Sequence, residues 1–144
     1  MTEDAEFKVI TPQPAVSKLL GPFLVKEVEG QDPIVGMRAR PDHSRSPYGH
    51  VGGGVLVNAC DFAMGFVLGK RLFVVQEDIV GVTTVNITAD FISSPKVGDW
   101  LEAKVNVLKM GRNICFCDCT LYAGDKLVMR SSATFTVVKP QPKI

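Results

Sequence analysis

The sequence has almost no surplus of charge of either sign. Its 144 residues include 16 Lys or Arg and 15 Asp or Glu, which gives a formal net charge of +1. A protein that binds nucleic acid or an anionic membrane mainly through charge needs a basic surface, and this composition does not supply one. We therefore expect no nucleic-acid partner, and recognition by shape, by apolar contact or by a few placed polar groups.

Cysteine is also scarce, and its spacing is unlike that of a metal site. Cys115, Cys117 and Cys119 alternate along one run, the fourth is Cys60, and no Cys-x-x-Cys pair occurs. Alternating residues of a strand point to one face, and three ligands on one straight edge cannot surround a tetrahedral metal. The four residues are therefore predicted to be small buried hydrophobes in a reducing compartment, with no metal bound.

The sequence shows neither a membrane-spanning run nor a leader. The most apolar window, 51–69, is rich in glycine and has Asp61 at its middle, where a charge opposes insertion into a bilayer. The first ten residues are acidic and lack the apolar stretch of a signal peptide. These features predict a cytoplasmic protein without a membrane partner.

The chain length is typical of one domain, and hydrophobic periodicity predicts its class. Residues 1–13 are polar and contain Pro, so we expect them to be loosely held. Residues 15–20 are a short helix candidate, 23–29 and 33–40 are weak strand candidates, and 41–54 form a long loop. Residues 55–70 are apolar almost all round, which requires other structure to wrap this helix.

Four long alternating runs follow, at 82–91, 100–109, 114–122 and 127–138. In the first, Val85, Ile87, Ala89 and Phe91 share one side, with Thr84 on the other. Period-two alternation with one polar face indicates an antiparallel sheet. We predict an α+β fold with a curved antiparallel sheet of about six strands around one long buried helix, forming a single domain over residues 1–144.

The loop that enters this helix is rich in glycine. Gly52, Gly53 and Gly54 allow close approach to the backbone, and the first N–H groups of a helix point outward. No Gly-Lys-Ser/Thr follows, and the later strands are antiparallel, so neither a P-loop nor a Rossmann site fits. The pattern suits a site for a carbonyl oxygen or oxyanion, unless the glycines only allow a tight turn.

Asp61 is the only charged side chain between Arg45 and Lys70. A carboxylate in an apolar helix needs a partner, and Asn58, three residues earlier on the same face, is a candidate. Asp61 is therefore either a structural, hydrogen-bonded carboxylate or a general base that orients water in an apolar pocket. The two histidines, His43 and His50, lie near this loop, where a surface position is the ordinary expectation.

The spacing between the helix start and Asp61 restricts the arrangement of a catalytic site. Seven to nine residues separate Asp61 from Gly52–Gly54, which is roughly 10 Å or more along a helix axis. One carbonyl group cannot easily contact both places in the same chain. If both are catalytic, two chains related by a two-fold axis would supply one each.

The order of these residues resembles the hotdog-fold acyl-CoA thioesterases of the phenylacetyl-CoA and 4-hydroxybenzoyl-CoA type, over about residues 22–138. The family has an Asn, a Gly, then His-Gly-Gly opening the helix, and an Asp nine residues after that His. The matching features are Gly49, Gly53-Gly54, Asp61-Phe-Ala-Met-Gly, Thr83–Phe91, Pro95, Gly98-Asp99 and the hairpin Val107-Leu-Lys-Met-Gly-Arg112.

The resemblance implies roles for individual residues. Asp61 would be the base or nucleophile, the Gly53 N–H would polarise the thioester carbonyl, and Thr84 would help to hold the water. Two positions depart from the family, because Gly52 stands where the family has His and Ser46 where it often has Asn. Simple alternation puts Thr84 opposite the apolar face, so this role requires a bulge or a position at a dimer edge.

The resemblance also implies substrate contacts and an oligomer. Candidate substrate-binding residues are Gly52, Gly54, His50, Asn58, Lys109 and Arg112, the last two on a hairpin that either meets coenzyme A phosphates or is a solvated turn. We predict an acyl-CoA thioesterase with no cofactor beyond the coenzyme A of its substrate, acting as a homodimer or a tetramer. The alternative is an acyl-CoA or aromatic-ligand binding protein with little turnover. A hydratase is disfavoured because no His follows Asp61 at a suitable helical spacing.

Overall fold

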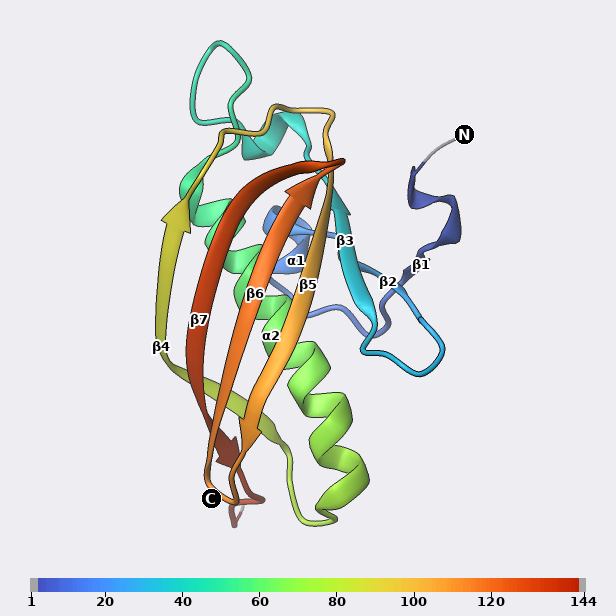
Figure 1. Ribbon diagram of the computed structural model, residues 1–144, viewed down its shortest axis with the longest axis vertical. Helices are drawn as coiled ribbons and strands as arrows, with labels where there is room; N and C mark the ends of the chain where they lie inside the picture. Colours follow the sequence, from blue (N-terminus) through green and yellow to red (C-terminus); the bar gives the residue numbers. More distant parts are fainter. Residues whose placement is uncertain (1–2, 143–144) are drawn as a thin grey trace.

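The computed structural model describes residues 3–142 and arranges them as one long helix along one face of a curved antiparallel sheet (Figure 1). This arrangement confirms the predicted α+β class. In chain order the elements are η1 (Glu3–Glu6), β1 (Lys8–Val9), α1 (Ser17–Leu20), β2 (Leu24–Lys26), β3 (Ile34–Arg38), η2 (Pro41–His43), α2 (Gly53–Val75), β4 (Gly81–Phe91), β5 (Trp100–Met110), β6 (Ile114–Ala123) and β7 (Lys126–Val138).

The sheet has seven strands in the order β1-β2-β3-β5-β6-β7-β4, and all neighbours are antiparallel. The sequence predicted about six, because β1 is only two residues long and too short for alternation to reveal it. Strand β4 follows α2 in the chain and lies at one edge of the sheet, where it pairs with β7. The place of β4 matters for the site, because it lies beside α2 at an open edge (Figure 1).

Helix α2 is longer than expected, spanning Gly53–Val75 instead of residues 55–70. The side that packs on the sheet is fully apolar and includes Leu56, Ala59, Cys60, Ala63, Met64, Val67, Leu68 and Leu72. On its other side, Phe62 stacks on Phe23 with 4.1 Å between ring centroids, and Phe66 stacks on Phe62 at 6.0 Å. Sheet and N-terminal residues together therefore cover most of a helix that has no polar face.

All four cysteines are free and buried, as the sequence predicted. Cys115, Cys117 and Cys119 point from β6 into the core, and Cys60 meets them from α2. Burial raises the pKa of the Cys117 thiol to about 12 and also raises that of Cys115. These thiols are therefore protonated at neutral pH and serve as small core side chains.

The expectation that residues 1–13 are loosely held is wrong for the segment that follows η1. Phe7 and Ile10 are buried, and β1 pairs with β2. The Phe7 ring packs edge-on against Trp100 with 5.0 Å between centroids. Apolar residues at positions 7 and 10 thus fix this segment to the sheet despite its polar neighbours; residues 1–2 lie outside the described part of the chain.

Strand β4 contains a β-bulge that simple alternation does not predict. Thr84 pairs with Phe135 and Asn86 with Thr134, so Val85 is an extra residue in the ladder. The expected placement of Val85 beside Ile87 on the apolar side is therefore wrong, and its side chain is 59% exposed. One inserted residue reverses the alternation and turns Thr84 toward α2.

Candidate functional site

The first turn of α2 presents backbone donors. Gly52 has φ −65° and an extended ψ of 139°, and its carbonyl oxygen accepts from the N–H groups of Val55 and Leu56 at 3.0 and 3.3 Å. Among the described residues, no acceptor meets the N–H groups of Gly53 and Gly54. As in other helices, these first donors are available to an acceptor outside the helix, and the helix dipole favours negative charge there.

The Phe91 ring, at the end of β4, covers Gly53. A Cβ added to Gly53 would lie 3.3 Å from two atoms of that ring, tighter than ordinary contact. At Gly52 an added Cβ would meet its neighbours only at 3.7 Å or more, and at Gly54 it would meet nothing within 4 Å. Of these three glycines, only Gly53 is packed so closely that an added Cβ would require a small shift of its neighbour, the half-exposed Phe91 ring.

Asp61 lies on α2 and accepts a hydrogen bond from a residue of β4. The hydroxyl of Thr84 donates to Asp61 Oδ1 at 2.6 Å. The bulge at Val85 makes this contact possible, because it places Thr84 on the side that faces the helix. The structure thus brings together two residues, 23 positions apart in the chain, that were both predicted as site residues.

Asn58, the candidate partner of Asp61, does not bond to it. The hydrogen bond to Asp61 comes from Thr84, and the buried Oδ1 of Asn58 has no partner in the described part of the chain. Spacing along a helix indicates only which residues share a face. It does not reveal a donor that arrives from a strand.

Asp61 and Thr84 lie in a groove of about 600 Å³ between α2 and β4. Most of its lining is apolar or aromatic, and Lys70 is the charged residue that lines it besides Asp61. The remaining lining residues are Pro12, Gln13, Pro14, Phe62, Gly65, Phe66, Gly69, Phe73, Gly81, Val82 and Phe135. A carboxylate beside an apolar groove is the arrangement expected where a polar reaction meets an apolar substrate group.

The long loop before α2 brings Ser46 and His50 together. Ser46 Oγ lies 3.2 Å from His50 Nδ1 and accepts from the His50 N–H at 3.4 Å. A backbone bridge between His50 and Lys96 ties the loop to the chain before β5. His43, in contrast, is 2% exposed, and its ring faces Arg40 and the Leu19 carbonyl oxygen.

Lys109 and Arg112 lie far from the start of α2 in the same chain. Both are exposed at the β5–β6 hairpin, which forms a turn at residues 111–113 as the sequence predicted. In Figure 1 this hairpin lies at the end of the sheet where α2 ends, and α2, which starts at Gly53, begins at the opposite end. One chain therefore does not place this basic hairpin beside the helix start.

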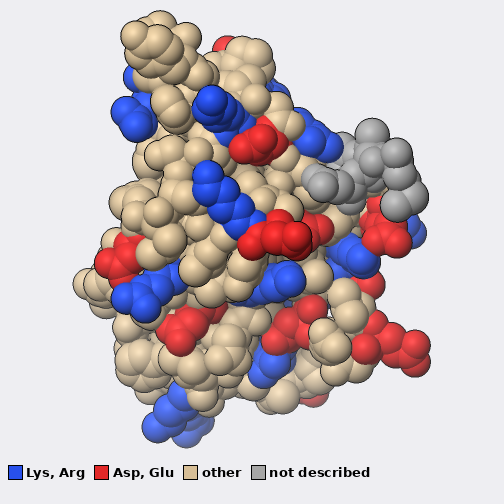
Figure 2. All heavy atoms as spheres, turned by 45° about the horizontal axis from the view of Figure 1, so that its top comes forward, with Lys and Arg blue, Asp and Glu red and all other residues tan. Residues whose placement is uncertain are grey.

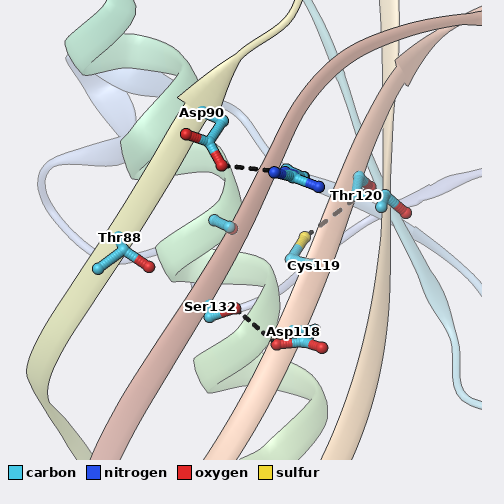
Figure 3. A pocket seen from close by; sticks show the side chains of 8 residues that line it. Thr88, Asp90, Asp118, Cys119, Thr120 and Ser132 are labelled. Carbon is cyan, nitrogen blue, oxygen red and sulfur yellow. Dashed lines mark hydrogen bonds and ion pairs between the residues drawn. The ribbon is translucent and has the colours of Figure 1, made fainter.

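A second hollow, of about 390 Å³, lies over β4, β7 and β6 (Figure 3). Its charged groups have partners within the hollow: Arg130 pairs with Asp90, and Asp118 accepts from the Ser132 hydroxyl at 2.7 Å. Asp61 and Thr84 are not part of its lining. The groove beside α2 is therefore the better candidate for a reaction site.

Charged side chains do not gather into a patch of one sign on the face drawn in Figure 2, where Lys and Arg alternate with Asp and Glu. Several form ion pairs, such as Lys26 with Glu6 and Arg71 with Asp32. Within residues 3–142, no group of three His, Cys, Asp or Glu side chains is placed to hold a metal ion. No described helix combines the length and the apolar character that crossing a membrane requires.

Sequence reasoning did not find the part of the groove wall that comes from Pro12, Gln13 and Pro14. Their sequence signal is weak, because a short Pro-containing segment near a chain end usually indicates a loose tail. Phe91 was predicted only as an apolar strand residue, and its position over Gly53 depends on packing between β4 and α2. A bulge in β4 was foreseen only as a condition for the role of Thr84.

Comparison with known proteins identifies the family. Residues 48–129, more than half of the chain, match the model of the Thioesterase superfamily. A Pseudomonas aeruginosa protein with the name "Putative esterase" is 30% identical over 117 residues, which cover 81% of this chain and 84% of that protein. This chain therefore belongs to the thioesterase superfamily.

Solved structures agree with this assignment. A "putative thioesterase, phenylacetic acid degradation-related protein" of Ralstonia eutropha JMP134 has a TM-score of 0.74 at 26% identity, over 88% of this chain and 92% of that chain. A "hypothetical thioesterase protein" of Streptococcus pneumoniae TIGR4, solved with coenzyme A, has a TM-score of 0.67 at 18% identity, over 83% and 88%. The fold is the hotdog fold that the resemblance implied.

Proposed function

We propose that this chain hydrolyses the thioester of an acyl- or aryl-CoA, with Asp61 as the carboxylate that directs water. The hydrogen bond from Thr84 to Asp61 at the apolar groove carries this proposal, because it holds one carboxylate oxygen and leaves the other for a water molecule. Water oxygen attacks the thioester carbon, Asp61 accepts the water proton, and the carbon–sulfur bond breaks. The coenzyme A sulfur leaves as a thiolate and takes up a proton.

The developing negative charge on the carbonyl oxygen needs a donor. We assign this role to the Gly53 N–H, which has no acceptor among the described residues and lies at the positive end of the α2 dipole. Asp61 follows Gly53 by eight residues, or about 12 Å of helix. The two groups therefore belong to one site only if they come from different chains.

The edge strand β4 supports a two-fold dimer of this kind. It is 11 residues long, has no Lys or Pro, and exposes Val85 and Phe91. A long edge strand presents unpaired N–H and C=O groups to which a strand of a second copy can pair. Antiparallel β4–β4 pairing would bring the C-terminal end of one β4, with Gly53 beneath Phe91, beside Thr84 and Asp61 of the partner chain.

Other contacts belong to the same proposal. Two-fold pairing would also place the partner's hairpin, with its copies of Lys109 and Arg112, at the end of the sheet where this chain's α2 begins (Figure 1). Lys109 and Arg112 would then attract the phosphates of coenzyme A. That the S. pneumoniae structural neighbour was solved with coenzyme A supports this ligand. Ser46, His50, Gly52, Gly54 and Asn58 would surround the thioester end of the substrate.

The proposal is tested by measuring coenzyme A thiol release from short, long and aromatic acyl-CoA thioesters. We expect turnover of at least one class. One observation favours a binding protein instead, because Gly52 supplies no side chain where the family has His. Saturable acyl-CoA binding without release of thiol would establish that alternative. If the chain neither binds acyl-CoA nor releases thiol from it, both functions are contradicted.

A further inference from the structure

Asn58, on α2, has a buried amide oxygen that the fold does not satisfy. Its Oδ1 has no hydrogen-bond partner within residues 3–142, whereas its Nδ2, which forms no hydrogen bond there either, is not buried. The side chain thus directs its oxygen into the protein and its two N–H donors outward. A buried acceptor without a donor destabilises a fold. Packing alone does not explain this amide, because an apolar side chain of the same shape would pack without that loss.

The position of Asn58 places its donors on the approach to the candidate site. Residues three and four apart on a helix are neighbours, so Asn58 adjoins Asp61 and Phe62 in one direction and Gly54 in the other. Asp61 and Phe62 line the groove, and a Cβ added to Gly54 would meet nothing within 4 Å. The helix surface between the start of α2 and Asp61 is therefore open at Gly54, where a substrate can reach the amide of Asn58.

The proposed reaction needs donors at this place. Attack of water on a thioester moves negative charge onto the carbonyl oxygen beside the attacked carbon, and Asp61 is the group that directs the water. Asn58 precedes Asp61 by three residues, about 4.5 Å along the helix axis. The amide of Asn is a known oxyanion donor beside backbone N–H groups. The donors of Asn58 thus lie within reach of the oxygen that gains charge.

We propose that Asn58 is a second oxyanion donor, whose Nδ2 hydrogen-bonds the thioester carbonyl oxygen of the substrate attacked at Asp61 of the same chain. The inference rests on the proposed function, because it requires Asp61 to direct water at an acyl-CoA thioester. The amide donates a hydrogen bond and transfers no proton, so the proton and thiolate steps are unchanged. The unsatisfied Oδ1 is then the consequence of directing the two N–H groups outward, since oxygen and nitrogen occupy opposite arms of the amide.

The first test replaces the amide with an apolar side chain of the same outline. Leu has the branched shape of Asn but neither its acceptor nor its donors, and it also favours a helix more. Because the buried unsatisfied oxygen disappears, we expect Asn58→Leu to raise Tm by about 2–4 °C. In the same variant, kcat on the best acyl-CoA should fall about 10²- to 10³-fold, with KM changed less than about threefold.

Two further variants make the result decisive. Asn58→Ala removes the amide without adding bulk, so its kcat should fall by a similar factor even where Leu is crowded. Ser17→Ala is the matched control, because Ser17 on α1 also has a buried oxygen without a partner among the described residues. Its kcat should equal that of the wild type. A lower Tm with unchanged kcat in both Asn58 variants would show a structural amide and overturn the proposal.

Mixed dimers show which site each Asn58 serves. If Asn58 acts beside Asp61 of its own chain, refolding Asn58→Leu together with Gly53→Pro gives heterodimers with one intact site, and activity should recover to about a quarter of wild type. Asn58→Leu refolded with Asp61→Asn should show no such recovery, because each site then contains one substitution. Recovery in the second mixture but not in the first would place Asn58 on the Gly53 side and overturn the assignment.

Binding of a stable ketone separates this inference from the proposed function. In acetyl-carba(dethia)-CoA a CH₂ group replaces the thioester sulfur, so the carbonyl remains but cannot be hydrolysed, whereas ethyl-CoA has no carbonyl. We expect Asn58→Leu to weaken binding of the ketone about two- to tenfold, the range for one hydrogen bond, and binding of ethyl-CoA by less than about twofold.

The outcomes of this binding experiment are distinct. If the wild-type chain hydrolyses no acyl-CoA but binds the ketone, the proposed hydrolysis fails and the ketone alone judges Asn58. Equal effects of Asn58→Leu on the ketone and on ethyl-CoA would overturn the assigned contact, whether or not the chain is a hydrolase. If the wild-type chain binds neither ligand and hydrolyses no acyl-CoA, both proposals fail.

Discussion

At the residue scale, the contact between Thr84 and Asp61 explains how a carboxylate is retained in an otherwise apolar stretch of helix. The hydroxyl of Thr84 satisfies Oδ1 at 2.6 Å, and the groove leaves the carboxylate open to water. A hydrogen-bonded carboxylate at the edge of an apolar groove can hold and deprotonate a water molecule. A purely structural Asp would need the bond but not the opening.

Asp61→Asn should remove the proposed base and leave the fold unchanged. The amide keeps an oxygen that can accept from Thr84, so the fold should remain intact, but it cannot accept a proton. We expect kcat on the best acyl-CoA to fall at least about 100-fold, the lower range for loss of a general base. Steady-state kinetics and a thermal melt on the same sample check this. Retained activity would make Asp61 structural.

Gly52 stands where the resemblance places a His, so this position allows a test of an added side-chain donor. Its φ of −65° and its ordinary Cβ contacts mean that a side chain is tolerated there. A well-aimed donor to developing charge is worth about 10²- to 10³-fold in rate. We expect Gly52→His to raise kcat and Gly52→Ala, its matched control, to leave kcat nearly unchanged.

The competing explanation is that His50 already supplies the donor. Ser46 Oγ lies 3.2 Å from its Nδ1, which fixes the ring in the loop. In that case His50→Ala would abolish activity and Gly52→His would add nothing. If neither substitution changes kcat, the assignment of this loop to the thioester is wrong.

The lowered pKa of His43 should make the stability of the folded chain depend on pH. Burial, and then the positive charge of Arg40, lower its pKa from the ordinary 6.5. The Arg40 N–H donates to Nδ1 at 3.0 Å, which requires that nitrogen to be unprotonated. As pH falls below 6.5 the unfolded chain binds a proton that the folded chain does not, so the folded state loses stability until the lowered pKa is reached.

Urea titrations between about pH 7 and pH 5 check this prediction. The free energy of unfolding of the wild-type chain should decrease more steeply over that interval than that of His43→Gln, which has no titrating ring at this position. A parallel decrease in the two proteins would show that His43 titrates alike in the folded and unfolded chain.

Residues that stand out locally could be predicted, and residues that depend on distant partners could not. Asp61 was identified because it is the only charge between Arg45 and Lys70, and Gly53 because three glycines precede a helix. Asn58 was only a candidate partner of Asp61, and the actual donor, 23 positions away on β4, could not be predicted from helix spacing. Gln13 was missed because its hydrogen bonds to Phe23 depend on the folding back of the N-terminal segment.

At the scale of elements, the start of α2 can be tested without disturbing the helix. Gly53→Pro removes the N–H group at the first helical position, where Pro is tolerated, and the extended conformation of Gly52 suits a residue that precedes Pro. Gly53→Ala adds a Cβ against Phe91 but keeps the N–H group. It is therefore the matched control for crowding.

We expect Gly53→Pro to lower kcat about 10²- to 10³-fold, the loss typical of one oxyanion donor, and Gly53→Ala to lower it much less. Circular dichroism should show the same helix content in both variants. Equal activities would mean that the N–H group of Gly53 does not contact the reacting carbonyl.

Elements with strong periodicity could be predicted, whereas irregular ones could not. The four long strands and the single long helix lie within a few residues of their predicted bounds. Val85 was assigned to the wrong side because a bulge has no marker in one sequence when neither Gly nor Pro is present. Strand β1 escaped prediction because two residues cannot show alternation, and its pairing with β2 depends on burial of Phe7 and Ile10.

At the scale of the whole molecule, Gly53 and Asp61 are too far apart in one chain to act on one carbonyl. About 12 Å of continuous helix separates them, and α2 shows no break between them. Pairing of two β4 edges would bring them together from opposite chains. This composite site is the central claim of the mechanism, and it cannot be reached by a monomer.

Mixing two inactive variants tests that claim most directly. Asp61→Asn and Gly53→Pro chains are unfolded together, refolded at equal concentration and assayed on one acyl-CoA. In a two-fold dimer, each heterodimer contains one intact site, made of Asp61 from one chain and Gly53 from the other, so activity should recover to about a quarter of wild type. Each variant refolded alone should stay inactive. Heterodimers that form and show no activity would contradict the composite site.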